Sequence, residues 1–256
     1  MKKGKLKKLP VKPVISGILL VTAVFLTLRL AVSGLCGLDY FRIKDVSVNK
    51  PMGKTDFSHL LGRSIFHVDL KKESRYISDQ YPVYKNIRIF RIFPDRIYIV
   101  FADRQALAAV KSYRAFHVDS DGVFFEADNG EAEGLPLITG LERKIPAPKS
   151  GRRYNIGELT AALNIIEEIG REGLPERYRL ERISVSDPES LSCFMRAGDS
   201  SHLEVKIGRN GLSGKISVLS RLLNQLKDDT AKIKYVDLRF KEPVIKFSED
   251  KTQGKK

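Results

Sequence analysis

The chain has 256 residues, of which 42% are apolar, and a formal net charge of +14. This apolar content suffices for one large or two modest folded units and excludes a wholly disordered protein. Half of the net charge precedes the folded part, and no basic stripe interleaved with aromatic residues follows, which argues against nucleic-acid binding; the early charges are Lys2, Lys3, Lys5, Lys7, Lys8, Lys12 and Arg29.

A long apolar segment follows a basic tail at residues 1–13. Residues 14–38 are predicted to form one transmembrane helix, because this length spans roughly 37 Å and a bilayer core is roughly 30 Å thick. Arg29 would cost about 3 kcal/mol at the bilayer centre, but its long side chain can reach the outer interface. The lysines predict a cytoplasmic N-terminus and an extracytoplasmic bulk. The alternatives are a cleaved signal peptide ending near Ala31-Val32-Ser33 and a lipoprotein acylated at Cys36, which the preceding leucine disfavours.

Residues 39–104 are predicted to form an α+β module, with two helices on a three-stranded sheet. Apolar residues alternate over 40–49, as in a strand, and recur at helical spacing over 57–66, where an aspartate is available as a cap. A second helix is predicted over 71–80. Two more alternating runs flank Phe93-Pro94-Asp95, which predicts a hairpin with Pro94 in its turn.

Residues 105–247 are predicted to form a larger β-rich domain with two helices. Strands are expected at 107–110, 115–118, 123–126, 135–138, 180–185, 191–196 and 203–207, and helices at 155–170 and 216–226. Two alternating runs within 233–247, separated by Lys241-Glu242-Pro243, predict a closing strand pair. Residues 248–256 are polar and predicted to be disordered.

The sequence predicts no catalytic, metal or cofactor site. The four histidines have no zinc-ligand spacing, and Cys36 and Cys193 exclude a disulfide framework; these histidines are His59, His67, His117 and His202. Gly208, Gly211, Gly214 and Lys215 resemble a phosphate loop but depart from the required spacing, so a plain strand-to-helix connection is favoured. Adjacent acidic pairs on predicted helices diverge by about 100° and cannot share a proton. We therefore expect no enzyme activity.

Four motifs occur in order after the apolar segment. They are Phe41-Arg42-Ile43-Lys44-Asp45-Val46; the hairpin turn at 93–95 followed by Asp103-Arg104-Gln105-Ala106-Leu107-Ala108; Val118-Asp119-Ser120-Asp121-Gly122-Val123-Phe124 with Leu135-Pro136-Leu137-Ile138-Thr139-Gly140; and Val236-Asp237-Leu238-Arg239-Phe240. Together these motifs resemble the bacterial cell-division family FtsQ, also called DivIB, whose first extracytoplasmic module is a POTRA domain. Asp103 and Ala106 stand where that family usually has glutamate and proline.

The resemblance implies a noncatalytic bitopic scaffold of the divisome, in the inner membrane at the division septum. It also implies that the end of the β domain recruits FtsB (DivIC) and FtsL. The partner-binding candidates are Tyr235, Val236, Asp237, Leu238, Arg239, Phe240, Val244, Lys246 and Phe247, of which the alternating set Val236, Leu238 and Phe240 is the better core candidate. Rival hypotheses are a POTRA-bearing secretion or envelope-assembly factor and a membrane-anchored enzyme.

Overall fold

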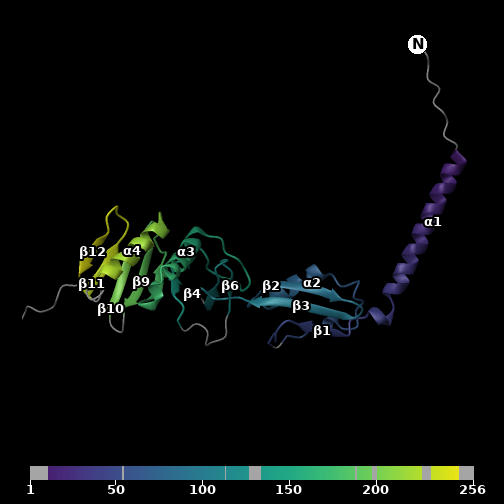
Figure 1. Ribbon diagram of the computed structural model, residues 1–256, viewed down its shortest axis with the longest axis horizontal. Coiled ribbons are helices and arrows are strands. Elements are labelled where there is room, and N and C mark those ends of the chain that lie inside the picture. The colour runs from purple at the N-terminus through teal and green to yellow at the C-terminus, as the bar shows by residue number, and fades with distance from the viewer. Residues whose placement is uncertain are drawn as a thin grey trace, which may run out of the picture. The chain divides into compact units, whose positions relative to one another are not determined.

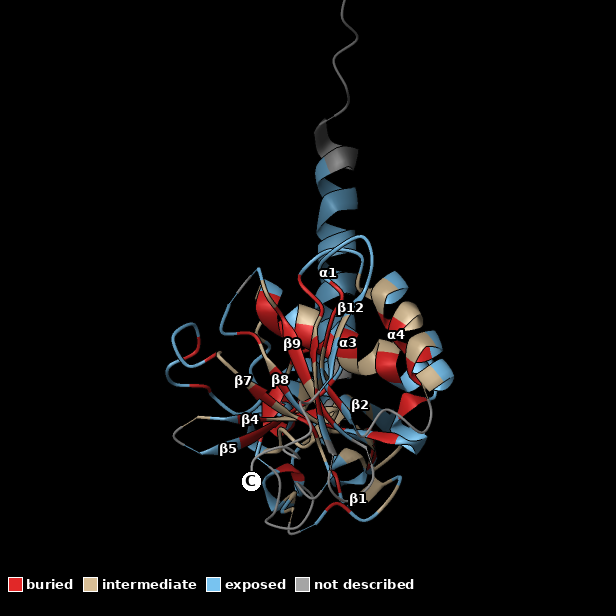
Figure 2. Ribbon diagram, turned by 90° about the vertical axis from the view of Figure 1, so that its left-hand side faces the viewer, coloured by how far each residue is buried: buried red, intermediate tan, exposed pale blue. Residues whose placement is uncertain are grey.

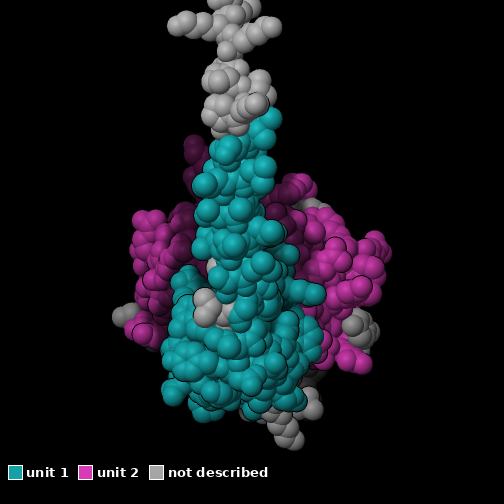
Figure 3. Space-filling view, turned by 90° about the vertical axis from the view of Figure 1, so that its right-hand side faces the viewer, with its two compact units in different colours: residues 1–77, 86–101 teal, residues 78–85, 102–256 magenta. Residues whose placement is uncertain are grey.

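The computed structural model describes residues 11–53, 55–112, 114–126, 134–187, 189–197, 201–226 and 232–247. Figure 1 shows the elements along the chain. The chain forms two compact units: Met1–Ile77 with Asn86–Phe101, and Ser78–Lys85 with Ala102–Lys256 (Figure 3). The predicted domain limits, 39–104 and 105–247, stay predictions. The predicted disordered tail, 248–256, lies outside the described residues.

Helix α1, Val11–Cys36, occupies the segment for which a transmembrane helix was predicted. Its large apolar side chains are exposed over the described stretch, and the hydroxyl groups of Thr22 and Thr27 donate to carbonyl oxygens one turn earlier in the helix. Within the described residues, no helix reaches the combination of length and apolar content that crossing a membrane requires. The helix is thus present, whereas its passage through a bilayer stays a prediction.

A three-stranded sheet and helix α2, Leu70–Gln80, form most of the first unit; the last three residues of α2, the first two of β2 and the last two of β3 are assigned to the second unit. The strands are β1, Asp45–Val48; β2, Tyr84–Ile92; and β3, Arg96–Asp103, in the order β1-β3-β2. Strands β2 and β3 flank the Phe93-Pro94-Asp95 turn, as predicted, and β1 runs parallel to β3. Residues Ile97, Ile99 and Phe101 alternate into the core, which explains the period-2 pattern of the sequence.

The helix predicted over 57–66 is wrong, because only a single 3₁₀ turn forms there, Ser58–Leu60. Phe57 is the N-cap residue of this turn, and the preceding Asp56 accepts a hydrogen bond from the Ser58 amide at 2.8 Å. The chain then becomes extended at Leu61, and Gly62 takes φ +74°. The apolar residues of 57–66 therefore lie in a loop that buries Leu60 and Ile65. Among the described residues, one α-helix, not two, accompanies this sheet.

The second unit contains a nine-stranded mixed sheet in the order β12-β11-β10-β9-β8-β7-β4-β5-β6. Its strands are β4, Ala108–Lys111; β5, Ala115–Val118; β6, Phe124–Phe125; β7, Leu137–Thr139; β8, Tyr178–Ser184; β9, Ser192–Ala197; β10, Ser201–Lys206; β11, Ile233–Asp237; and β12, Val244–Phe247. Figure 2 shows, in red, the buried residues along these strands. The β-rich character of this region is as predicted.

Two helices pack on this sheet: α3, Gly157–Arg171, and α4, Leu212–Leu226. They are linked side by side by hydrogen bonds from Ser213 Oγ to Glu168 Oε2, at 2.9 Å, and from Ser217 Oγ to Glu172 Oε1, at 2.5 Å. Their apolar faces join the sheet in one core, to which they contribute Leu159, Leu163, Ile216, Leu219 and Leu223. Both helices were predicted from their 3.6-residue periodicity.

The third motif of the sequence contains a buried aspartate that organises a turn. Asp119 Oδ1 accepts hydrogen bonds from the amides of Asp121, at 3.0 Å, and Val123, at 2.8 Å. Its Oδ2 forms an ion pair with Arg104, whose side chain is only 10% exposed. Arg104 also donates from its backbone amide to the Val83 carbonyl, at 2.8 Å. The motif residues thus connect the start of the second unit to its first turn.

The same motif ends in a glycine at a place where two chain segments nearly touch. Strands β7 and β8 are parallel neighbours, so the residues that follow their C-terminal ends lie next to each other. Gly140, directly after β7, takes φ +94°, and a Cβ there would lie 2.7 Å from Ser186 Cα and closer still to its amide nitrogen. Only glycine fits this backbone conformation and this space.

Candidate partner-binding edge

Strand β12 forms one end of the nine-stranded sheet. Strand β11 lies between β10, to which it is parallel, and β12, to which it is antiparallel, with Val236 opposite Val205 and Ile245. The backbone groups of β11 are therefore committed to its neighbours. Strand β12 presents its outer edge without a neighbour among the described strands, which is the geometry that accepts an added strand.

The nine residues predicted to bind partners separate into buried and exposed sets. Val236 and Leu238 belong to the buried core, as their alternation predicted. Phe240, predicted with them as a core residue, is instead 61% exposed. The reason is that β11 ends at Asp237, so the alternation stops and the chain turns. The exposed set also includes Val244, Lys246 and Phe247 on β12.

Asp237 and Arg239 form an internal ion pair at the end of β11. The Arg239 guanidinium donates to both carboxylate oxygens, with Nε to Oδ1 at 3.0 Å and Nη2 to Oδ2 at 2.6 Å. Arg239 Nη1 also donates to Ser190 Oγ at 3.2 Å. The hydrogen bonds from Arg239 hold the pKa of Asp237 below its ordinary value, against the opposing effect of burial. This pair fixes the turn from which Phe240 projects.

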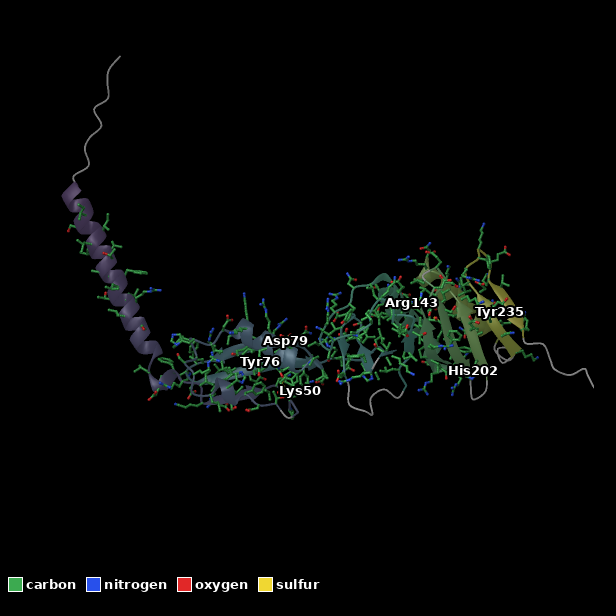
Figure 4. All side chains as sticks on the ribbon, turned by 180° about the vertical axis from the view of Figure 1, so that it is seen from behind. Lys50, Tyr76, Asp79, Arg143, His202 and Tyr235 are labelled. Atoms are coloured by element: carbon green, nitrogen blue, oxygen red, sulfur yellow. The ribbon has the colours of Figure 1, made fainter. Side chains whose placement is uncertain are left out.

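Tyr235 is intermediate in exposure between the buried and the exposed candidates. Figure 4 shows Tyr235 and His202 on the neighbouring strands β11 and β10. The ring of Tyr235 is half-buried, and the Lys206 ammonium lies over it, 4.9 Å from the ring centroid. This cation–π contact gives Tyr235 a local structural role on the face opposite Val236.

An apolar pocket of about 340 Å³ lies beside Phe240. It is lined by Gly211, Gly214, Lys215, Val218, Leu238, Phe240, Lys241 and Pro243. Lys215 Nζ donates to the Ile207 carbonyl oxygen at 2.7 Å, so this lysine holds the strand-to-helix connection. The glycine-rich segment that resembled a phosphate loop is therefore one wall of a pocket next to the predicted edge.

Sequence reasoning missed this pocket. The signal was Gly211 and Gly214, because residues three apart lie on one side of a helix start and two glycines leave that side bare. These two glycines and the Leu238–Phe240 turn line the same pocket. Because the two segments are far apart in the chain, no local sequence pattern could predict that they meet.

The Asp237–Arg239 pair leads to a pH prediction. We expect Asp237→Asn to lower the free energy of unfolding at pH 7 by about 1.5–3 kcal/mol, since hydrogen bonds to charged groups contribute about that much. Because the folded pKa lies below the ordinary value of 3.8, the carboxylate's contribution is complete above that value and is lost as the pH falls through the folded pKa. The difference between the two proteins should therefore shrink below pH 3.8.

Denaturant unfolding at a series of pH values measures this difference. Glu142→Gln, on an exposed loop, serves as the control and should leave stability unchanged at each pH. A constant gap between Asp237→Asn and the parent down to pH 2 would contradict the assignment.

Three of the four histidines have local side-chain contacts. His59 Nε2 lies 3.0 Å from Glu73 Oε2, His202 Nδ1 lies 3.4 Å from Glu181 Oε2, and the ring of His117 packs edge-on against Phe125. Within the described ranges, no three side chains of histidine, cysteine, aspartate or glutamate gather as metal ligands would.

The chain resembles known cell division proteins. A family model described as "Cell division protein FtsQ/DivIB, C-terminal" matches residues 106–239, which is more than half of the chain. The protein named "Cell division protein FtsQ" in Syntrophotalea carbinolica is 24% identical over 85% of this chain and 78% of its own length. The protein of the same name in Koribacter versatilis is 23% identical over 78% of this chain and 58% of its own length.

A third relative of that name, from Geotalea daltonii, is 22% identical over 82% of this chain and 77% of its own length. The family model covers the nine-stranded sheet from just before β4 to just after β11. It therefore includes the aspartate turn, Gly140 and the Asp237–Arg239 pair described above. These matches confirm the resemblance found in the sequence motifs: the chain belongs to the FtsQ/DivIB family of cell division proteins.

Proposed function

We propose that this cell division protein is a noncatalytic bitopic scaffold whose β domain recruits FtsB (DivIC)-like and FtsL-like proteins to the septum. The observation that carries the proposal is the outer edge of β12 beside the apolar pocket. An edge strand offers unpaired amide and carbonyl groups to an incoming extended segment. Alternate side chains of that segment then supply specificity.

Exposed side chains at this edge suit a partner strand with apolar and acidic residues. Val244 and Phe247 are each nearly half exposed, at 46% and 47%. Phe240 lines the pocket, whose volume of about 340 Å³ has room for an apolar side chain of the partner. Lys241 and Lys246 are exposed on the same hairpin, so a partner with acidic residues beside its apolar anchor would complement it.

The proposed location is the inner membrane, with the N-terminus in the cytoplasm and residues 39–256 outside it. Support comes from the lysines of the basic tail and from the exposed apolar side chains of α1. In this proposal, α1 and the POTRA-like module determine where the protein is located, and the β domain recruits its partners.

Site-specific photo-crosslinking in dividing cells tests the recruitment. A photoreactive residue at Phe240, Val244 or Phe247 should capture a single-span division protein, identified by mass spectrometry. The same residue at Tyr76, an exposed aromatic on α2 in the first unit (Figure 4), is the matched control and should not. For the purified partner, Phe240→Ala should weaken binding about 30-fold, as loss of an aromatic anchor worth about 2 kcal/mol would.

Two results together would refute the proposal. One is a failure of all three edge positions to capture a division protein above the Tyr76 control. The other is an even distribution of the tagged full chain around the cell, with no enrichment at the septum.

A further inference from the structure

Four aromatic rings form a continuous chain in the first unit. The ring centroids of Tyr40 and Phe41 lie 5.1 Å apart, those of Phe41 and Phe66 5.1 Å, and those of Phe66 and Phe93 5.5 Å. The rings come from three separate segments: the residues after α1, the loop before α2 and the β2–β3 turn. We call these four residues the aromatic cluster.

The cluster is exposed although its rings contact one another. Tyr40 is 62% exposed, Phe93 57% and Phe66 39%, and the adjoining Leu38 and Ile92 are also exposed. A contiguous apolar surface of this kind marks an interaction site. Single exposed apolar residues would need no explanation, but four rings in mutual contact do.

Backbone hydrogen bonds hold the cluster as a fixed platform. The Ile65 amide donates to the Phe41 carbonyl, and the Ile43 amide to the Arg63 carbonyl, each at 2.9 Å. Arg91 then ties the β2 end to the loop before α2, donating from Nε to the Ile65 carbonyl at 2.7 Å and from Nη2 to the Val68 carbonyl at 2.7 Å. The exposed rings therefore keep their relative positions without a partner.

Basic residues occur in the three segments that carry the aromatic cluster, and ion pairs join Arg42 with Asp39, Lys44 with Asp95, and Arg63 with Glu73. The segments 39–45, 61–67 and 90–96 contain five basic and three acidic residues, a net charge of +2; the basic ones are Arg42, Lys44, Arg63, Arg91 and Arg96. Rings that rest at the depth of lipid headgroups, with arginine and lysine beside them, are the usual composition of a protein surface at a membrane interface.

The cluster is tethered close to the end of α1. Five residue steps separate Cys36, where α1 ends, from Phe41, so these two residues are at most about 18 Å apart whatever path the chain takes. The interfacial region on each side of a bilayer core is about 5–8 Å thick. If α1 spans a membrane, the tether keeps the cluster within reach of that membrane's surface.

We propose that the aromatic cluster and the basic residues of its segments bind the outer surface of the bilayer that α1 enters, with the rings at headgroup depth and the basic groups beside lipid phosphates. This inference rests on the proposed membrane anchoring. It adds a second contact with the membrane, made by the folded module itself. The occupant is an anionic phospholipid surface; a protein covering the cluster is the competing outcome.

The chain has no tryptophan, so a single introduced tryptophan is a unique fluorescent probe. Phe93→Trp keeps an aromatic ring in the cluster and lies far from α1 in sequence, so the tether alone does not force it to the membrane. The full chain carrying Phe93→Trp is reconstituted in vesicles of phosphatidylcholine and phosphatidylglycerol with brominated acyl chains. We expect a blue-shifted emission and quenching about threefold stronger than for Tyr76→Trp, the matched exposed control on α2.

Three outcomes separate the possibilities. Equal quenching of the two variants overturns the inference. A blue shift at Phe93→Trp without lipid quenching also overturns it, because a protein surface then covers the cluster. Flotation with the vesicles after an alkaline wash reports on α1 alone: a chain that does not float contradicts the anchoring and with it this inference, whereas a floating, unquenched chain contradicts the inference alone.

Discussion

Gly140→Ala is expected to lower the stability of the second unit by about 3 kcal/mol or more, because strain and steric overlap add at this position. A non-glycine residue at φ +94° is strained, and the new Cβ would overlap the Ser186 backbone, which cannot move as a flexible side chain could. Since 1 kcal/mol corresponds to about 2–4 °C for a domain of this size, the melting temperature should fall by roughly 6–12 °C. Calorimetry of the full chain in detergent measures it.

Two other glycines of the same unit separate the two causes. Gly173 has φ +68° but open space around the position of a Cβ, so Gly173→Ala should show the strain alone, about 1 kcal/mol. Gly170 lies in α3 with open space, so Gly170→Ala should stabilise the unit by about 0.4–1 kcal/mol. If Gly140→Ala were no more harmful than Gly173→Ala, the close approach to Ser186 would be of no consequence.

Asp119→Ala is expected to cost about 3–5 kcal/mol, the range found when one partner of a buried ion pair is removed. The carboxylate is fully buried, and its loss leaves Arg104 without its counter-charge. The same change removes the acceptor for the Asp121 and Val123 amides. Denaturant unfolding measures the change in the free energy of unfolding. Relative to the parent, hydrogen exchange should accelerate most at the amides of Asp121 and Val123, which lose their acceptor.

The conservative variant Asp119→Asn tests which loss matters. Its side-chain oxygen can still accept from the turn amides but has no charge for Arg104, so its cost should fall between that of Asp119→Ala and zero. The surface pair of Glu167 and Arg171, at 3.6 Å, provides the comparison: Glu167→Gln should change stability by less than about 0.5 kcal/mol. Equal effects of Asp119→Ala and Glu167→Gln would show that burial of the pair contributes nothing.

Elements with a strong internal period were predictable from the sequence. Helices α3 and α4 have an apolar stripe that only a helix can bury on one side, and the Phe93-Pro94-Asp95 hairpin has alternation on both sides of a turn residue. The residues over 57–66 had a helical period too, yet they form a loop. Their apolar side chains reach the core although the backbone that carries them is irregular. Gly62 has a positive φ, which an α-helix does not contain.

The candidate edge was predictable only in part. Alternation placed Val236 and Leu238 in the core correctly and failed at Phe240, since the strand ends three residues earlier and period 2 applies only within a strand. The pocket joins Gly211 to Pro243, residues far apart in the chain. Their proximity depends on the parallel pairing of β10 with β11. Local sequence patterns do not predict which strands pair.

The assignment of residues 78–85 to the second unit affects how the protein can be recombined with its relatives. Arg104 donates to the Val83 carbonyl and, from Nε, to the Pro82 carbonyl at 3.0 Å. A chimaera that joined a foreign anchor and POTRA module to this chain at residue 105 would omit both carbonyls and the arginine that neutralises Asp119. A functional graft of the second unit has to carry the segment 78–85 and Arg104 with it.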